Sequence, residues 1–182
     1  NECLEIEEAN DYFEVKIKDL NNDLIFILQA KYLINAAGIF SAEIAKLIDK
    51  TRQLDIQYIK GEYYSYSGKE QINHLIYPVP GKLSLGLHAT LDLGRGIKFG
   101  PSALEIQDLD YSVSEINKTN FANLIQQYWP SMRESNLSPG YSGIRAKVRD
   151  VEDFVLEKLD IKNKIAINII SYISPGLTSS LA

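Results

Sequence analysis

The sequence predicts a mixed fold, α+β / α/β, in which an antiparallel sheet interrupts a strand–turn–helix unit. Residues 31–35 are a short, mostly apolar run that leads into Ala36-Ala37-Gly38, and helical spacing of apolar residues begins at Ser41. Strand-like runs broken by Gly and Pro then fill residues 56–99, a pattern typical of an antiparallel sheet. Two more strand-like runs follow between residues 154 and 170.

The first half of the chain is predicted to form a hairpin, a strand and a helix, in that order. Residues 11–18 alternate between apolar and charged side chains, which predicts a half-buried strand. Residues 19–23 have turn chemistry, and 24–28 form a second run, so the pair predicts a hairpin. After the strand at 31–35, residues 41–48 predict a short amphipathic helix.

The second half predicts further strands at residues 56–66, 75–79, 83–90 and 97–99, and a helix over 114–129 that Pro130 ends. Strands at 154–159 and 164–170 are joined by a polar turn at 160–163. At the end of the chain, Ser174 is a favourable N-cap and Pro175 suits the first turn of a helix.

This order predicts three segments. Residues 1–53 hold a hairpin and a strand–turn–helix unit, 54–140 an antiparallel sheet with a helix, and 141–182 a return to the first domain.

Composition excludes several classes of protein. The net charge of −5 and the scattered basic residues give no nucleic-acid footprint. Cys3 is the single cysteine, so we expect no disulfide framework and no metal centre. No run approaches the length needed to cross a bilayer. We expect a cytoplasmic location, with peripheral attachment to the inner membrane left open.

Small residues at the end of a strand give the first candidate site. Ala36, Ala37 and Gly38 let backbone approach a ligand such as a pyrophosphate or a flavin, although on these residues alone a tight, closely packed turn is the favoured interpretation. No G-x-G-x-x-G follows any predicted strand, so the phosphate-binding loop of a dinucleotide fold is missing.

Three side chains are candidates for substrate chemistry. Tyr64 offers a hydroxyl to a substrate or packs in a sheet. His88, among small residues, is a candidate general base for an alcohol or a structural histidine. Arg145 follows Ser142-Gly143 and either binds a carboxylate through two parallel hydrogen bonds or forms a surface ion pair.

Six sequence blocks in order resemble the D-amino-acid-oxidase-like family of FAD-dependent oxidoreductases, and within it the L-2-hydroxyglutarate oxidase/dehydrogenase branch. The match covers about the C-terminal half of a family member. The blocks are Y-L-I-N-A-A-G (32–38), K-G-E-Y-Y (60–64), L-I-Y-P-V-P (75–80), L-G-L-H-A-T (85–90), F-G-P-S-A (99–103) and S-P-G-L-T-S-S-L-A (174–182).

The resemblance implies an incomplete FAD-binding domain of the glutathione-reductase-like type with an inserted antiparallel substrate domain. It implies that Ala37 and Gly38 lie against the cofactor, and that Gly176, Leu177 and Thr178 begin a helix facing the flavin ring. Arg145 matches the arginine that engages a substrate carboxylate, although Ala146 replaces the family's proline after it. His88 lies in the branch's histidine block, which suggests a base for the substrate hydroxyl.

The expected function is that of the C-terminal portion of an FAD-dependent oxidoreductase acting on a small 2-hydroxy acid, with 2-hydroxyglutarate favoured. A glycerol phosphate or an amino acid is the other substrate class that the family implies. Because the N-terminal cofactor motifs are missing, we expect this chain alone not to retain FAD, and an N-terminal half polypeptide is the expected partner. The alternative is a non-catalytic remnant or assembly subunit of a split flavoenzyme.

Overall fold

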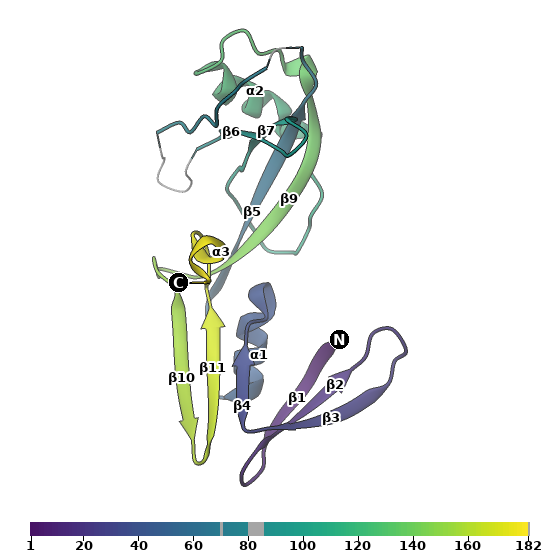
Figure 1. The fold of residues 1–182 in the computed structure, drawn as a ribbon, viewed down its shortest axis with the longest axis vertical. Helices are drawn as coiled ribbons and strands as arrows, with labels where there is room; N and C mark the ends of the chain where they lie inside the picture. Colours follow the sequence, from purple (N-terminus) through teal and green to yellow (C-terminus); the bar gives the residue numbers. More distant parts are fainter. Residues whose placement is uncertain (70, 80–85, 182) are drawn as a thin grey trace. The chain divides into compact units, whose positions relative to one another are not determined.

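A computed structural model describes residues 1–69, 71–79 and 86–181 (Figure 1). The chain divides into two compact units, Asn1–Gln57 with Ala146–Ala182, and Tyr58–Arg145. The second unit is thus an insertion in the first. The predicted boundaries followed residues 53 and 140, and the cofactor and substrate roles given to these segments remain predictions.

An antiparallel three-stranded sheet opens the first unit. Its order is β1-β2-β3, formed by Glu2–Glu8, Phe13–Lys18 and Ile25–Ala30. The hairpin of β2 and β3 agrees with the prediction, and its turn is held by the backbone amide of Asp19, which donates to the carbonyl of Leu24. Strand β1 was not predicted, because its charged residues break the alternation that identifies a strand.

The second sheet of this unit mixes antiparallel and parallel pairing. Strands β10 (Val155–Ile161) and β11 (Lys164–Ile170) form the predicted hairpin, and β11 pairs in parallel with β4 (Tyr32–Asn35). After the 3-10 turn η1 (Gly38–Phe40), helix α1 (Ser41–Ile48) contacts both β1 and β11 (Figure 1). The buried core of this unit is formed by Ile6, Phe13, Ile48 and Ala166.

A pair of buried asparagines joins the ends of the two parallel strands. Asn35 on β4 lies opposite Asn168 on β11, and its amide nitrogen donates to the Asn168 side-chain oxygen at 2.9 Å. The same nitrogen donates to the carbonyl of Ser41 at 2.7 Å, and the Asn35 oxygen accepts from the backbone amide of Ala37 at 3.3 Å. One side chain therefore fixes the strand end, the turn after it and the start of α1.

The chain ends in a shorter helix than the sequence suggested. Helix α3 spans Gly176–Ser179, with Pro175 at the N-cap position and no side chain capping it. The prediction that Ser174 caps this helix is wrong, because the first helical hydrogen bond is accepted by the carbonyl of Pro175 from the amide of Ser179.

The second unit is built on one antiparallel sheet. Its order is β6-β7-β5-β8, with β9 also paired to β5. The strands are β5 (Ile56–Tyr66), β6 (His88–Leu91), β7 (Ile97–Gly100), β8 (Leu104–Ile106) and β9 (Leu137–Val148).

Several details of this unit differ from the sequence prediction. The helix expected over 114–129 is a 3-10 turn, η2 (Glu115–Asn117), followed by α2 (Lys118–Gln126); a further 3-10 turn, η3 (Glu134–Asn136), precedes β9. Instead of a strand at 75–79, the structure has a single bridge from Ile76 to Ala89. Of the strand expected at 83–90, positions 83–85 lie outside the described residues. The mixed α and β content itself is confirmed.

One face of this sheet is the core of the second unit. Tyr64, Phe99 and Ala89 are fully buried there, and the Tyr64 ring packs on Phe121 of α2 with centroids 4.5 Å apart. Because neighbouring side chains on a strand point to opposite faces, this burial determines which residues occupy the other face.

We predict that Asn35→Ala lowers the free energy of unfolding by about 2 kcal/mol, because it leaves the buried Asn168 oxygen and the Ser41 carbonyl without their donor. Urea denaturation measures the change. The control is Asn163→Ala, which removes only an exposed 3.3 Å bond to Asp11 and should change stability by less than about 0.5 kcal/mol. Equal losses in the two variants would contradict the bridging role of Asn35.

Candidate functional site

The sheet face opposite the core carries the polar and aromatic side chains of the second unit. On β7, Lys98 and Gly100 alternate with the buried Phe99, and they pair with Ser65 on β5 and His88 on β6. Four strands contribute to this face. We call it the polar face and define it by His88, Lys98, Tyr63, Tyr141 and Arg145.

Two stacked tyrosines lie at the centre of the polar face. The rings of Tyr63 on β5 and Tyr141 on β9 are 4.7 Å apart and within 12° of parallel. Burial raises the pKa of the Tyr63 hydroxyl, the Tyr141 hydroxyl raises it further, and the charge of Arg145 lowers it. The Tyr63 hydroxyl therefore stays protonated at neutral pH, where it can donate to an anion.

Arg145 reaches the same region from further along β9. Its charge acts on the Tyr63 phenol, and the alternation of β9 places it on the same face as Tyr141, with Gly143 between them. A Cβ on Gly143 would contact nothing within 4 Å, so the surface between Tyr141 and Arg145 is open. A carboxylate has room to meet the guanidinium there.

His88 lies on the outermost strand of this face and is largely buried, with 7% exposure. The ring of Tyr77 covers it, with centroids 4.0 Å apart. Its strand partner Gly100 lies directly against the Tyr63 ring, so His88, Gly100 and Tyr63 form a continuous row. His88 and Arg145, two residues that the sequence proposed independently, thus lie on the same face of the sheet as the stacked tyrosines.

Tyr64, the third sequence candidate, does not reach this face. Its side chain is fully buried against Phe121, and its hydroxyl donates to the carbonyl of Ser114. Burial, aided by the charges of Glu62 and Glu115, raises the pKa of Tyr64 to about 12. The prediction that Tyr64 binds substrate is corrected here: the tyrosine that is available to a ligand is its neighbour, Tyr63.

The cofactor candidates lie in the first unit. Ala37 and Gly38 are exposed just after β4, while Gly176, Leu177 and Thr178 follow β11. Strands β4 and β11 run parallel, and Asn35 lies opposite Asn168. The residues that follow β4 and the residues that follow β11 therefore lie at the same end of the sheet. Gly176 is buried against the Tyr172 ring, whereas Leu177 and Thr178 are exposed.

The turn at Ala37 and Gly38 fits part of a dinucleotide cofactor. Gly38 has φ of +59°, and a Cβ built on it would meet nothing within 4 Å, so the backbone is open to a ligand. Ligands of α/β sheets bind outside the carboxyl ends of the strands, which is where this turn lies. These residues therefore fit the close approach of FAD, although the chain has no G-x-G-x-x-G loop for its pyrophosphate.

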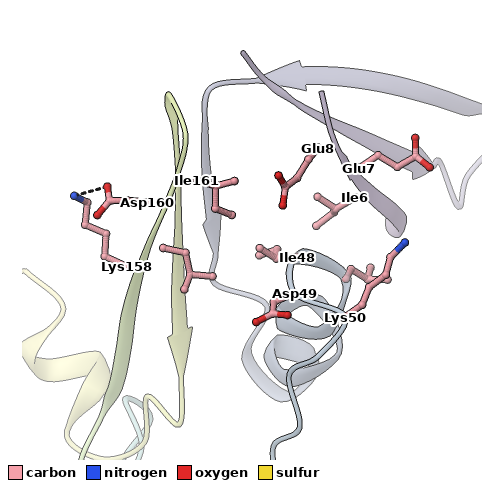
Figure 2. Close-up of a pocket in the computed structure, with 11 residues that line it drawn as sticks. Ile6, Glu7, Glu8, Ile48, Asp49, Lys50, Lys158, Asp160 and Ile161 are labelled. Carbon is pink, nitrogen blue, oxygen red and sulfur yellow. Dashed lines mark ion pairs between the residues drawn. The ribbon is translucent and has the colours of Figure 1, made fainter. Parts of the chain in front are cut away.

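Two cavities of the first unit differ in their relation to these residues. A cavity of about 610 Å³ is lined by Ala37 together with Phe40 and Leu47, so it adjoins the cofactor candidates. A cavity of about 740 Å³ lies among β1, the end of α1 and β10, and includes none of the predicted site residues (Figure 2). Lys158 there pairs with Asp160 at 2.8 Å, and both side chains are exposed.

Two absences hold for the residues that the structure describes. Across 1–69, 71–79 and 86–181, no three His, Cys, Asp or Glu side chains gather as metal ligands would. Within the same ranges, no helix has both the length and the apolar character needed to span a membrane.

Comparison with known proteins decides the family. The family model for FAD dependent oxidoreductases, DAO, matches residues 2–182. The chain belongs to the DAO family of FAD-dependent oxidoreductases. The FAD predicted as cofactor is therefore the cofactor of its family.

Relatives within this family extend the comparison. The chain is 34% identical over 170 residues to a mitochondrial L-2-hydroxyglutarate dehydrogenase of Arabidopsis thaliana, covering 82% of this chain and 35% of that protein. It is 29% identical over 191 residues to an L-2-hydroxyglutarate dehydrogenase of Indibacter alkaliphilus, covering 82% and 48%. The chain thus spans less than half the length of these relatives.

A solved structure supports the fold. A dithionite-reduced L-α-glycerophosphate oxidase from Mycoplasma pneumoniae with FAD bound superimposes with a TM-score of 0.80 at 21% identity. It covers 97% of this chain and 46% of that one. This likeness supports a partial FAD-binding fold for the DAO-family chain.

Sequence reasoning missed Tyr63, Tyr141 and Lys98 as members of the site. Tyr63 and Tyr64 are adjacent in one strand, so the sequence shows that they face opposite ways but not which of them faces the core. The signal that separates them is the buried residue of the partner strand, Phe99, which aligns with Tyr64.

We predict that Gly100→Ala destabilises the protein by about 2 kcal/mol or more, because its Cβ would lie 2.6 Å from the Tyr63 ring and 2.7 Å from the carbonyl of Glu62. The φ of +153° adds strain for any side chain. Urea denaturation gives the stability, and the NMR signals of Tyr63 report its displacement. Gly143→Ala, on the same face with no atom within 4 Å of its Cβ, is the matched control and should change stability little; similar losses in both would show that the packing of Tyr63 against Gly100 is unimportant.

Proposed function

We propose that this chain supplies the substrate-binding face and part of the cofactor site of an FAD-dependent enzyme that oxidises a 2-hydroxy acid, with 2-hydroxyglutarate favoured. The observation that carries the proposal is the polar face, to which three strands contribute an arginine, a protonated tyrosine and a histidine. Similarity to two L-2-hydroxyglutarate dehydrogenases favours a hydroxy acid over the other substrate classes of the family. The inserted second unit is then the substrate domain.

In the proposed reaction, Arg145 binds the substrate carboxylate through two parallel hydrogen bonds, and the Tyr63 hydroxyl donates a third. His88 accepts the proton of the substrate hydroxyl as the alcohol becomes a ketone. Bound FAD supplies the acceptor for the hydride that leaves the carbon bearing that hydroxyl. The burial of His88 beneath Tyr77 excludes water from the proton transfer.

An amino-terminal half, in the same polypeptide or a separate one, completes the cofactor site in this proposal. Parallel sheets are normally covered on both faces, yet Tyr32 and Ile34 on β4 are 70% and 64% exposed. Among the described residues β4 pairs only with β11, so its other edge is free for a further strand. A half that adds strands there would also supply the missing pyrophosphate loop.

The experiment measures flavin and activity together. The purified chain is mixed with FAD, with and without the amino-terminal half, and absorbance between about 350 and 500 nm reports bound flavin. We expect FAD retention and oxidation of 2-hydroxyglutarate only when both halves are present.

Two results would contradict the proposal. Flavin retention without oxidation of any 2-hydroxy acid would favour a non-catalytic remnant or assembly subunit. Preferential oxidation of a glycerol phosphate or an amino acid would show that the protein is an enzyme but that its substrate is not a 2-hydroxy acid.

We predict that Arg145→Lys in the two-half enzyme raises KM for 2-hydroxyglutarate by about 10- to 100-fold, because lysine cannot make the paired hydrogen bonds worth about 1.5–3 kcal/mol. Steady-state kinetics provide the measurement. Lys147→Arg, two residues along β9 in an exposed ion pair with Glu152, is the control and should leave KM unchanged. An unchanged KM in Arg145→Lys would show that Arg145 does not bind the substrate carboxylate.

A further inference from the structure

The polar face holds a second cation that the proposed reaction does not use. The ammonium of Lys98 on β7 lies 5.2 Å from the centre of the Tyr141 ring, on the stacked pair of Tyr63 and Tyr141. Its side chain is 29% exposed, so Lys98 is partly accessible from solvent. Lys98 therefore adjoins the stacked pair, and Arg145 lies on the same face, where its charge acts on Tyr63.

We propose that Lys98 binds the second carboxylate of a dicarboxylic 2-hydroxy acid, while Arg145 binds the carboxylate next to the hydroxyl. This rests on the proposed function and adds the residue that selects a diacid over a monoacid. The two stacked tyrosines form the floor between the cations, against which the methylene chain of the substrate packs.

The spacing suits a short diacid. The Lys98 ammonium lies over the Tyr141 ring, and Tyr141 is four residues from Arg145 on β9. The Cα atoms of Tyr141 and Arg145, which stand for the two ends of the proposed subsite, are therefore about 13 Å apart at 3.3 Å per residue. A five-carbon diacid spans about 5 Å between its carboxyl carbons, from C–C bonds of about 1.5 Å. Each carboxylate-to-cation contact adds about 3 Å. In this arrangement the side chains of Arg145 and Lys98 each extend toward one carboxylate of the ligand.

The ion pair that Lys98 already makes does not prevent this role. Asp92 approaches its ammonium at 3.5 Å, and both side chains are partly exposed. Such exposed pairs contribute little, and an ammonium has three donors, so Asp92 orients Lys98 while leaving donors for a ligand. The backbone amide of Gly96 donates to Asp92 at 2.8 Å and holds that carboxylate in its turn.

The test uses the full chain and two inert probes, glutarate and butyrate, which share one carboxylate and differ in the second. Ligand-observed NMR titration should show glutarate binding at least fivefold more tightly than butyrate. Lys98→Met should abolish this preference, and Lys98→Arg should keep it. The matched control is Lys118→Met on α2, a lysine of 25% exposure with one carboxylate 3.8 Å away, and it should keep the preference.

Equal binding of the two probes to the unaltered chain, or a preference that survives Lys98→Met, would overturn the assignment. Circular dichroism confirms that each variant is folded. Because the probes bind without FAD and undergo no reaction, failure of this subsite is separate from failure of the proposed oxidation, which the flavin and activity measurements report.

Discussion

The second unit depends on the two-residue periodicity of its central sheet. Once Tyr64, Phe99 and Ala89 are buried against α2, the alternation of each strand forces Tyr63, Lys98 and His88 to the opposite face. A shift of one residue in any strand would exchange the two sets. The register that forms the core therefore also places the side chains of the polar face, on which the proposed site depends.

A network of two buried charges, Glu62 and Lys60, and the exposed carboxylate of Asp110 holds that register in place. Glu62, one residue before Tyr63, is almost fully buried and accepts hydrogen bonds from the Ser114 amide at 3.3 Å and the Asn117 amide group at 2.7 Å. Lys60, also buried, pairs with Asp110 at 3.0 Å and lies 3.7 Å from Glu62. Two hydrogen bonds from Ser112 and the Lys60 ammonium hold the pKa of Asp110 at about 2, so this carboxylate stays charged. Such fully paired charges fix one arrangement of β5 against the segment that leads into α2.

Much of this architecture could be predicted from the sequence, because local patterns of residues determine the hairpins and the turns. The hairpins of β2 with β3 and of β10 with β11 follow from alternation and turn residues, and the turn at Ala37 and Gly38 follows from small residues at the end of an apolar run. Long-range pairing has no such local signal. That β4 lies beside β11, or that Phe99 aligns with Tyr64, depends on contacts between residues far apart in the chain. The prediction that Tyr64 binds substrate was wrong for this reason. The sequence does not distinguish two adjacent tyrosines of one strand, because only the partner strand determines which of them is buried.

The asparagine bridge orders the turn of the first unit that is proposed to contact the cofactor. Asn35 and Asn168 use their hydrogen bonds on each other, on the Ser41 carbonyl and on the Ala37 amide. A hydrophobic pair at these positions would pack well but would leave those backbone groups unsatisfied, and the turn would lose its fixed geometry. The amide pair instead orders an exposed turn of small residues, so the backbone of the turn proposed to contact the cofactor is held in one conformation. Preorganisation of this kind lowers the entropy lost when a ligand binds.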